Sequence, residues 1–308
     1  HIILKQSIKI EYIDTKPHMA ELKILGQKEL KRYLNLFAES VKSNIRFNLL
    51  VEGAPGTAKT LAVKNMVSKL QKELNSIPYV RVTGSHDAIP SDLIGDIDIQ
   101  KYKDGIADII DGPLLKANGD KYPGVIYVDE FNRFSEYTLI TFTEIMAEWQ
   151  VSFPKTPITK PLKANIIATM NPYDISGITD IPQHILDRFN ARIIINYPNE
   201  ETEFEIAKQH IHYYYKEAFQ SLEQYFVPIV STTRVLRKLG IAIGPRAYLS
   251  TFDLLALEYL LGTTINEEIA IEHFKNSIRA KIANMDEDKQ SEIISTATIT
   301  LEEELKNR

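Results

Sequence analysis

The chain has no cysteine among its 308 residues and only one tryptophan. The missing thiols exclude disulfides, thiolate metal sites and thiol catalysis, and they agree with a cytoplasmic location. The sequence also lacks an apolar run near the ~20 residues that a membrane-spanning helix needs. A net charge of only −5 offers no general attraction for nucleic acid, which disfavours a nucleic-acid partner.

What is present is the composition of a soluble globular protein, with 44% hydrophobic and 25% charged residues. This length leaves room for about two domains. Residues 2–13 alternate weakly between apolar and polar side chains, and they lack the charged start and long apolar core of a signal peptide. We therefore expect residues 1–20 to form an N-terminal arm or an added strand.

The most informative stretch is a glycine-rich loop between an apolar strand, Phe47–Val51, and a helix with apolar residues at helical spacing. The loop consists of Gly53, Ala54, Pro55, Gly56, Thr57, Ala58, Lys59 and Thr60. Strand, loop and helix together are the context of a Walker A motif, which binds nucleotide phosphates. The alternative is a glycine-rich turn with an incidental lysine.

In the Walker A interpretation, each part of the loop has a physical role. Backbone N–H groups at the start of the helix would bind phosphate oxygens. Lys59 would reach the β- and γ-phosphates, Thr60 would hold Mg²⁺, and Leu61 would complete the nucleotide contacts. Ala58 stands where the consensus has a third glycine, and it adds only a methyl group.

A second apolar strand, Val125–Val128, ends in the carboxylates of Asp129 and Glu130, about 70 residues downstream of the loop. Its uninterrupted apolar character is typical of a parallel strand that is buried on both faces. Asp129 would support Mg²⁺ through water, and Glu130 would orient or activate the attacking water. An acidic pair after a strand can also cap a helix, but beside the phosphate loop we favour an ATPase.

The wider pattern predicts an α/β domain that is followed by a helical one. Five predicted strands alternate with helices: Phe47–Val51, Tyr79–Val82, Val125–Val128, Asn165–Met170 and Ala191–Tyr197. Such alternation predicts a parallel sheet with helices on both faces. From residue 199 onward the apolar spacing is helical. We therefore expect a core over residues 21–198 and a smaller helical domain over residues 199–308.

Two segments interrupt the predicted core. Alternating isoleucines at about 96–110, on both sides of Lys103-Asp104-Gly105, predict a short hairpin with a glycine turn. A second hairpin is expected at about 150–163, where Val151–Phe153 and Ile158–Leu162 flank a tip with two prolines. Neither hairpin contains a residue that we assign to catalysis.

These features together resemble the MoxR family of AAA+ ATPases, in the clade that carries a helix-2 insert. Five stretches match the family's pattern: Ile24–Gln27, Gly53–Thr60, Asp129–Arg133, Ile181–Phe189 and Gly244–Ala247. Alanine before the loop lysine is the family's own form of Walker A, whereas Gly244 stands where the family usually has serine. The resemblance implies an αβα sandwich with a five-stranded parallel sheet and a smaller all-α lid. It also implies that the two hairpins are the helix-2 insert and the pre-sensor-1 insert.

The resemblance assigns roles to residues outside the two Walker motifs. Gly26 would border the adenine, and Asn171, at the end of the fourth strand, would act as sensor 1 by contacting the γ-phosphate or the attacking water. Arg188 would be an arginine finger that reaches a neighbouring subunit, where its planar cation suits spread charge. Arg246 would be sensor 2 in the lid. The alternatives are a strand cap for Asn171, an intrachain partner of Asp187 for Arg188, and a solvated side chain for Arg246.

For function, the resemblance implies an enzyme that hydrolyses ATP with Mg²⁺, forms a ring that is usually a hexamer, and remodels or assembles protein complexes like a chaperone. Family members often work with a von Willebrand A-type partner. A second hypothesis is a nucleic-acid motor, because replicative helicases of the same clade share both inserts, and Lys155, Lys160 and Lys163 lie on or near the second hairpin. A third hypothesis is a ring that binds ATP without turnover, which the complete set of catalytic candidates disfavours.

Overall fold

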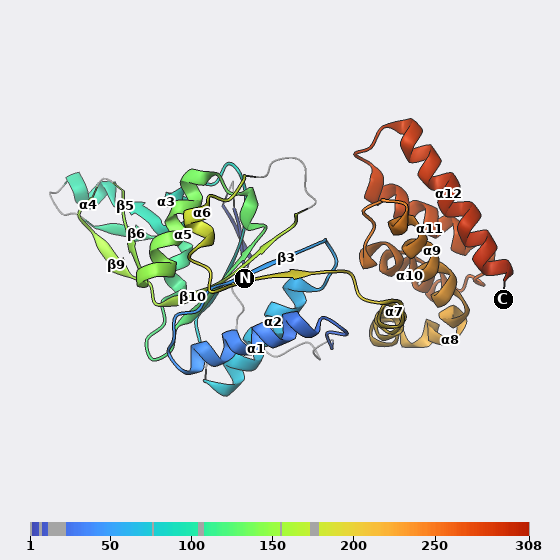
Figure 1. Cartoon of the computed structure of the whole chain (residues 1–308), viewed down its shortest axis with the longest axis horizontal. Helices are drawn as coiled ribbons and strands as arrows, with labels where there is room; N and C mark the ends of the chain where they lie inside the picture. The colour runs from blue at the N-terminus through green and yellow to red at the C-terminus, as the bar shows by residue number, and fades with distance from the viewer. Residues whose placement is uncertain are drawn as a thin grey trace. The chain divides into compact units, whose positions relative to one another are not determined.

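A computed structural model describes residues 2–5, 8–11, 23–75, 77–103, 108–154, 156–172 and 179–307. The chain folds into two compact units, of which the first is built around a sheet and the second is helical (Figure 1). The first unit contains His1–Glu21, Gln27–Ala54 and Ala58–Ile195, and the second contains Leu22–Gly26, Pro55–Thr57 and Asn196–Arg308.

A parallel sheet forms the centre of the first unit (Figure 1). Its five parallel strands lie in the order β4 (Tyr79–Thr83), β7 (Gly124–Asp129), β10 (Ala164–Met170), β3 (Leu49–Gly53) and β11 (Ala191–Ile195). The predicted α/β fold with a five-stranded parallel sheet is thereby confirmed. Because these strands run the same way, the carboxyl ends of β3, β7 and β10 meet at one edge, where open α/β sheets bind ligands.

The first parallel strand, β3, begins at Leu49 and not at the predicted Phe47. Asn48 leaves the ladder because its backbone N–H donates to Asn190 Oδ1 at 2.7 Å. At its other end, β3 continues through Gly53 because it stays paired with β11 there. The glycine-rich loop therefore starts directly at the end of a paired strand.

The N-terminal residues add two strands to this sheet. β1 (Ile2–Lys5) and β2 (Ile8–Glu11) form an antiparallel pair, and β2 pairs antiparallel with β4. The arm therefore extends the sheet on the β4 side. Residues 12–20 of the predicted arm lie outside the described residues.

Helices cover both faces of the sheet (Figure 1). On one face, α1 (Lys28–Lys42) packs against α2 (Lys59–Glu73). The other face carries a hydrophobic core, and five helices of different lengths contribute residues to it. These helices are α3 (Pro90–Ile94), η1 (Pro113–Ala117), η2 (Phe131–Arg133), α5 (Glu136–Glu148) and α6 (Gln183–Leu186).

Burial on both faces explains why the central strands read as continuous apolar runs. In β7, Ile126 and Val128 belong to the core under α5. Val125 and Tyr127 point to the opposite face, because successive side chains of a strand alternate, and they are equally buried. The sheet is thus sandwiched between two helical layers.

The segment at about 96–110 differs from the simple hairpin that the alternating isoleucines predicted. β5 (Gly95–Ile97) and β6 (Ile109–Asp111) pair antiparallel, but a short helix, α4 (Ile99–Lys103), follows β5. This helix begins because Asp98 Oδ1 accepts two backbone N–H groups of its first turn, at 3.0 and 3.3 Å. The predicted glycine turn at residues 104–105 lies outside the described residues.

The second predicted hairpin is present as an antiparallel pair of β8 (Gln150–Ser152) and β9 (Thr159–Pro161). Its base is fixed to α5, because the Glu144 carboxylate accepts the backbone N–H of Ser152 at 2.7 Å. Lys155, at the tip, lies outside the described residues.

From Asn196 onward, the described residues form helices and no strand, which confirms the predicted helical C-terminal region. In chain order, the elements are α7 (Glu200–Tyr214), η3 (Lys216–Ala218), α8 (Phe219–Leu222), η4 (Glu223–Tyr225), α9 (Phe226–Lys238), α10 (Pro245–Leu260), α11 (Glu267–Ile282) and α12 (Glu287–Lys306). Aromatic rings form part of their shared core, with Phe226 and Phe252 at 5.0 Å between centroids. None of the helices in the described part of the chain is long and apolar enough to cross a membrane.

Candidate nucleotide-binding site

The glycine-rich loop Gly53–Thr60 joins β3 to α2 and contains two residues with left-handed backbone. Gly56 has φ 82° and Ala58 has φ 65°. Turns of this kind can direct successive backbone N–H groups into one concavity, which suits an anion. For Ala58 this conformation costs roughly 1–2 kcal/mol, because its Cβ crowds the backbone. A strained residue therefore stands directly before Lys59.

Lys59 is the first residue of α2, and its side chain folds back over the loop. Its Nζ atom donates to the carbonyls of Gly53 at 2.5 Å and Ala54 at 2.9 Å. The N-terminus of α2 carries partial positive charge at the same place. The loop thus combines an ammonium group, a helix N-terminus and a concave backbone, which together favour phosphate.

Asp129, at the end of β7, lies in a cluster that joins four elements. Thr60 Oγ1, on α2, is 3.4 Å from Asp129 Oδ2. Thr169, on β10, donates to Asp129 Oδ1 at 2.7 Å, and Arg81, on β4, forms an ion pair with Oδ2 at 2.6 Å. The fold thus brings together Thr60 and Asp129, the two predicted metal ligands. Arg81 and Thr169 are partners that the sequence analysis missed.

The electrostatics of this cluster keep Asp129 charged. Burial raises the pKa of Asp129, but hydrogen bonds from Thr169 and Arg81 and the Arg81 charge outweigh it, and the net shift is downward. For Tyr127, on the same strand, burial raises the pKa of the hydroxyl, which stays protonated. That hydroxyl lies 3.0 Å from Thr60 Oγ1 and 3.4 Å from Thr169 Oγ1. Neutral hydroxyls therefore surround an ionised carboxylate.

The donor set suits Mg²⁺. Thr60 and Asp129 offer hard oxygen ligands, and Mg²⁺ typically takes one or two protein oxygens and completes its shell with phosphate oxygens and water. The described residues contain no group of three or more His, Cys, Asp or Glu that could hold a metal ion by themselves. These oxygens therefore fit a metal that is shared with a bound phosphate.

Glu130 has an unusual backbone for a residue with a side chain. Its φ of 56° and ψ of 49° are left-handed, a conformation that costs about 1–3 kcal/mol and is typical of functional sites. Gly84 maintains this turn: its N–H donates to the Asp129 carbonyl at 2.7 Å, and a Cβ at Gly84 would lie 2.1 Å from the Glu130 carbonyl oxygen. The Glu130 carboxylate is 3.2 Å from Arg133 Nε, and both side chains are 40% exposed.

Asn171 directly follows β10, so it lies at the same edge of the sheet as Asp129. It is half-buried, and its backbone carbonyl lies 3.5 Å from Asn132 Nδ2. The predicted sensor and the acidic pair therefore follow two adjacent parallel strands at the same edge of the sheet.

Arg188 is exposed on the short segment between α6 and β11. Its backbone is fixed, because its carbonyl accepts from Asn48 Nδ2 at 3.2 Å. The expected alternative partner, Asp187, accepts instead from Gln183 Nε2 at 2.6 Å, and the described part of the chain contains no ion pair of Arg188. The Arg188 side chain is therefore exposed to solvent.

Gly26 and Arg246 belong to the second unit. Gly26 has φ 65°, which a glycine adopts without strain. Arg246 is exposed in the first turn of α10, which starts at Pro245 after the N-cap Gly244. Their contacts with a nucleotide stay predictions.

The chain is similar to several known proteins. Residues 48–191 match the model of the ATPase family associated with various cellular activities (AAA). The chain is 30% identical to Chaperone MoxR1 of Mycobacterium tuberculosis, over 52% of this chain and 39% of that protein. It is 28% identical to Protein MoxR of Paracoccus denitrificans, over 57% and 47% of the two chains. It is also 28% identical to DNA replication licensing factor mcm5 of Dictyostelium discoideum, over 63% and 27%.

The five-stranded parallel sheet and the family match over residues 48–191 together give this part of the chain the fold of the AAA ATPases. Over about half of its length the chain is similar to these two MoxR proteins, in agreement with the motif resemblance. The aligned region spans less than half the length of each of these three relatives.

Proposed function

We propose that this chain binds ATP together with Mg²⁺ at the loop Gly53–Thr60 and hydrolyses it to ADP and phosphate. The observation that supports this best is the contact of Thr60 with Asp129, two residues 69 positions apart whose oxygens lie 3.4 Å from each other. Thr169 and Arg81 keep the Asp129 carboxylate ionised, which gives the pair the charge that a Mg²⁺ site needs.

In this proposal, the loop grips the phosphates. Lys59 would exchange the carbonyls of Gly53 and Ala54 for oxygens of the β- and γ-phosphates by rotation of its flexible side chain. Backbone N–H groups of the loop would donate to the same phosphates. When bound, Mg²⁺ neutralises negative charge on the phosphate oxygens.

Glu130 is our candidate for activating the attacking water. The side chains of Glu130 and Arg133 are each 40% exposed, so their ion pair is weaker than a fully buried pair would be. The strained backbone of Glu130 supports a functional role, because such strain persists only where neighbours such as Gly84 enforce it. Asn171, at the same sheet edge, would help to hold the water or the γ-phosphate.

We infer that the complete active site is shared between subunits of a ring, most simply a hexamer. Arg188 supports this inference, because its guanidinium is exposed and has a fixed backbone. A cation of this kind, inserted from a neighbour, stabilises the charge of the transition state and is worth roughly 10³ to 10⁵ in rate. An isolated subunit would then be almost inactive.

We further propose that ATP turnover drives the remodelling or assembly of protein complexes. The name of the Mycobacterium tuberculosis relative, a chaperone, supports a protein client. A von Willebrand A-type protein is the partner that the family resemblance favours.

The nucleic-acid motor is the second candidate, and the similarity to the replication licensing factor favours it. Two of its three candidate lysines are engaged within the chain: Lys160 Nζ pairs with Asp111 Oδ1 at 2.6 Å, and Lys163 Nζ donates to the carbonyls of Asp120 and Lys121 at 2.8 and 3.2 Å. Binding of single-stranded DNA, titrated against salt, separates the two candidates. Tight binding at physiological salt that a Lys160→Gln, Lys163→Gln variant loses would favour the motor.

Mixing two inactive variants tests the shared ATPase site. Lys59→Ala lacks the phosphate grip and Arg188→Ala lacks the finger, so each alone should be inactive. Mixed subunits should regain turnover, because an intact loop can then meet an intact Arg188, and parental activity should rise with protein concentration. If assembled mixtures regain no activity at any ratio, Arg188 acts within its own subunit or outside the site.

A further inference from the structure

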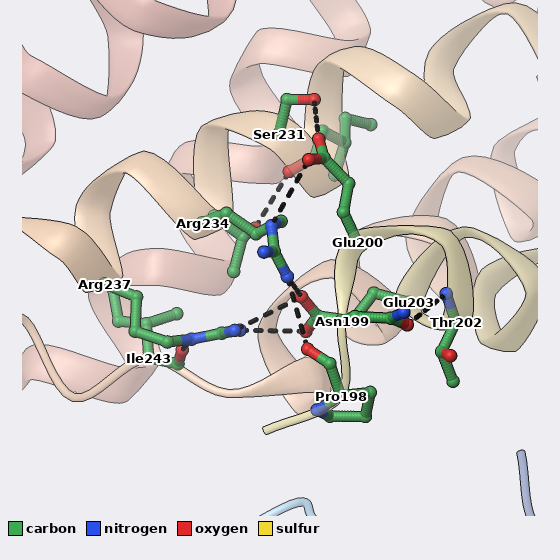
Figure 2. Close-up of polar contacts among 11 residues, drawn as sticks. Pro198, Asn199, Glu200, Thr202, Glu203, Ser231, Arg234, Arg237 and Ile243 are labelled. Carbon is green, nitrogen blue, oxygen red and sulfur yellow. Dashed lines mark hydrogen bonds and ion pairs between the residues drawn. The ribbon is translucent and has the colours of Figure 1, made fainter. Parts of the chain in front are cut away.

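A fully buried carboxylate lies in the second unit, at the start of α7. Glu203 has 0% side-chain exposure, and two arginines of α9 hold it (Figure 2). Arg234 Nη1 donates to Oε2, while Arg237 donates through Nη1 to Oε2 at 3.2 Å and through Nη2 to Oε1 at 3.0 Å. Arg237 thus grips both carboxylate oxygens, which fixes the plane of its guanidinium.

The two arginines hold different parts of the backbone (Figure 2). Arg234 Nη1 donates to the carbonyl of Pro198, in the segment that leads into α7, at 3.3 Å. Arg237 Nε donates to the carbonyl of Ile243, in the segment that leads into α10, at 2.9 Å. The Glu203 cluster, defined as Glu203, Arg234 and Arg237, therefore ties the entry of α7 to the entry of α10.

A tyrosine extends this connection to the N-cap of α10. The guanidinium of Arg237 lies 4.0 Å from the ring centroid of Tyr197. The same ring packs on Gly244, where a Cβ would lie 2.9 Å from Tyr197 Cε1. Arg237 therefore holds the residues on either side of the Ile243–Gly244 bond, one through a hydrogen bond and the other through Tyr197.

The first turn of α10 carries Arg246 and is set by these contacts. Gly244 is the N-cap of α10, and Arg246 is its second helical residue. Tyr248, one turn into the helix, is fully buried; burial and then the nearby Glu203 charge raise the pKa of its hydroxyl. Arg237 thus holds the segment before the helix through Ile243 and Tyr197, and the buried Tyr248 anchors the start of the helix in the core.

A buried ion cluster contributes less to stability than its Coulomb attraction suggests, because each charge must be taken out of water. An apolar core could not replace the directed hydrogen bonds by which Arg237 holds both Glu203 and the Ile243 carbonyl. We propose that Arg237, held by Glu203, is a positioning residue for Arg246, so that breaking its tether weakens the preference for ATP over ADP. This rests on the proposed role of Arg246 as a sensor of bound nucleotide.

Arg237→Lys tests the tether while it keeps the positive charge beside Glu203. A lysine has no planar fork and cannot hold both carboxylate oxygens and the Ile243 carbonyl. Arg234→Lys is the matched control, because it makes the same change in the same cluster but on the side of Pro198. Affinities for fluorescent ATP and ADP analogues are measured for both variants, and a thermal melt without nucleotide records any loss of folding.

We expect Arg237→Lys to lower the ATP-over-ADP preference about tenfold, because this factor corresponds to the free energy of one lost hydrogen bond to a charged group. Arg234→Lys should change it less than about twofold. In an Arg246→Ala background, Arg237→Lys should cause no further loss, because residues that act through one another are not additive. Tyr197→Leu removes the ring between Arg237 and Gly244 and leaves all three charges, so it should reproduce the defect even if Arg237→Lys folds poorly.

Equal losses in the parental and Arg246→Ala backgrounds would overturn the positioning role, and so would equal effects of Arg237→Lys and Arg234→Lys. If Arg246→Ala itself kept the parental ATP-over-ADP preference, the sensor role would be wrong and this inference with it. A parent that binds no ATP at all would instead overturn the proposed function.

Discussion

The ion pair between Arg81 and Asp129 allows a quantitative test of the site's electrostatics. Arg81 Nη2 lies 2.6 Å from Asp129 Oδ2, and its guanidinium carbon lies 5.5 Å from the centroid of the Tyr127 ring. Arg81→Met retains much of the apolar stem and removes the charge. The remaining Asp129 carboxylate keeps its hydrogen bond from Thr169 but loses its counter-ion.

The expected cost follows from the burial of the pair. Removing one member of a buried ion pair costs about 3–5 kcal/mol, because the other charge stays uncompensated. Here the side chains of Arg81 and Asp129 are 15% and 16% exposed, so we expect about 2–3 kcal/mol. Added Mg²⁺ and ATP should stabilise Arg81→Met more than the parent, because the metal supplies the missing positive charge.

The assay is urea unfolding followed by the fluorescence of Trp149, the only tryptophan, which lies in the first unit at the end of α5. Lys160→Met is the matched control, since it breaks the more exposed pair with Asp111 and should cost less than about 1 kcal/mol. If Arg81→Met cost no more than Lys160→Met, the electrostatic account of Asp129 would be refuted.

The pH dependence of the unfolding free energy is a second test of this ion pair. The folded-state pKa of Asp129 lies below its ordinary value of 3.8, so its contribution is complete above that value and is lost as the pH falls through the folded pKa. The difference between the parent and Arg81→Met should therefore be full at neutral pH and shrink under acid conditions. A difference that grew on acidification would contradict this assignment.

Two further predictions concern the turn before the catalytic candidate and the second hairpin. Gly84→Ala should lower ATP turnover by at least about tenfold while ATP binding is retained, because its Cβ would meet the Glu130 carbonyl at 2.1 Å; steady-state hydrolysis and equilibrium binding check this. Shortening the hairpin tip at residues 154–157 should leave basal turnover within a few-fold and abolish stimulation by a protein client, measured once a client is captured, because the tip carries no catalytic candidate.

The sequence predicted the local parts of this fold well. Short apolar stretches that alternate with helical segments located all five parallel strands, and the signal was clearest in β7, where every residue before Asp129 is buried. The loop Gly53–Thr60 stood out because its chemistry is contained in one short segment. Both features depend on neighbours in the chain, and such features can be read without a structure.

The parts that the sequence did not predict depend on contacts between distant residues. Arg81 and Thr169 reach Asp129 only because β4 and β10 flank β7 in the sheet, which brings together residues that are 48 and 40 positions apart in the chain. The isoleucine pattern near residues 96–110 was wrong about Ile99, because the cap at Asp98 starts a helix there. The Glu203 cluster gave no signal either, since a glutamate and two arginines in a helical region normally indicate solvated faces.

The most direct test of the central claim compares ATP binding and turnover in Glu130→Gln, Lys59→Ala and the parent. Glu136→Gln, an exposed glutamate at the start of α5, is the control and should keep parental turnover. We predict that Glu130→Gln binds ATP normally but loses at least about 100-fold in turnover, because the base is gone while the phosphate grip remains. Lys59→Ala should lose binding as well. Parental turnover in Glu130→Gln would contradict the proposed mechanism.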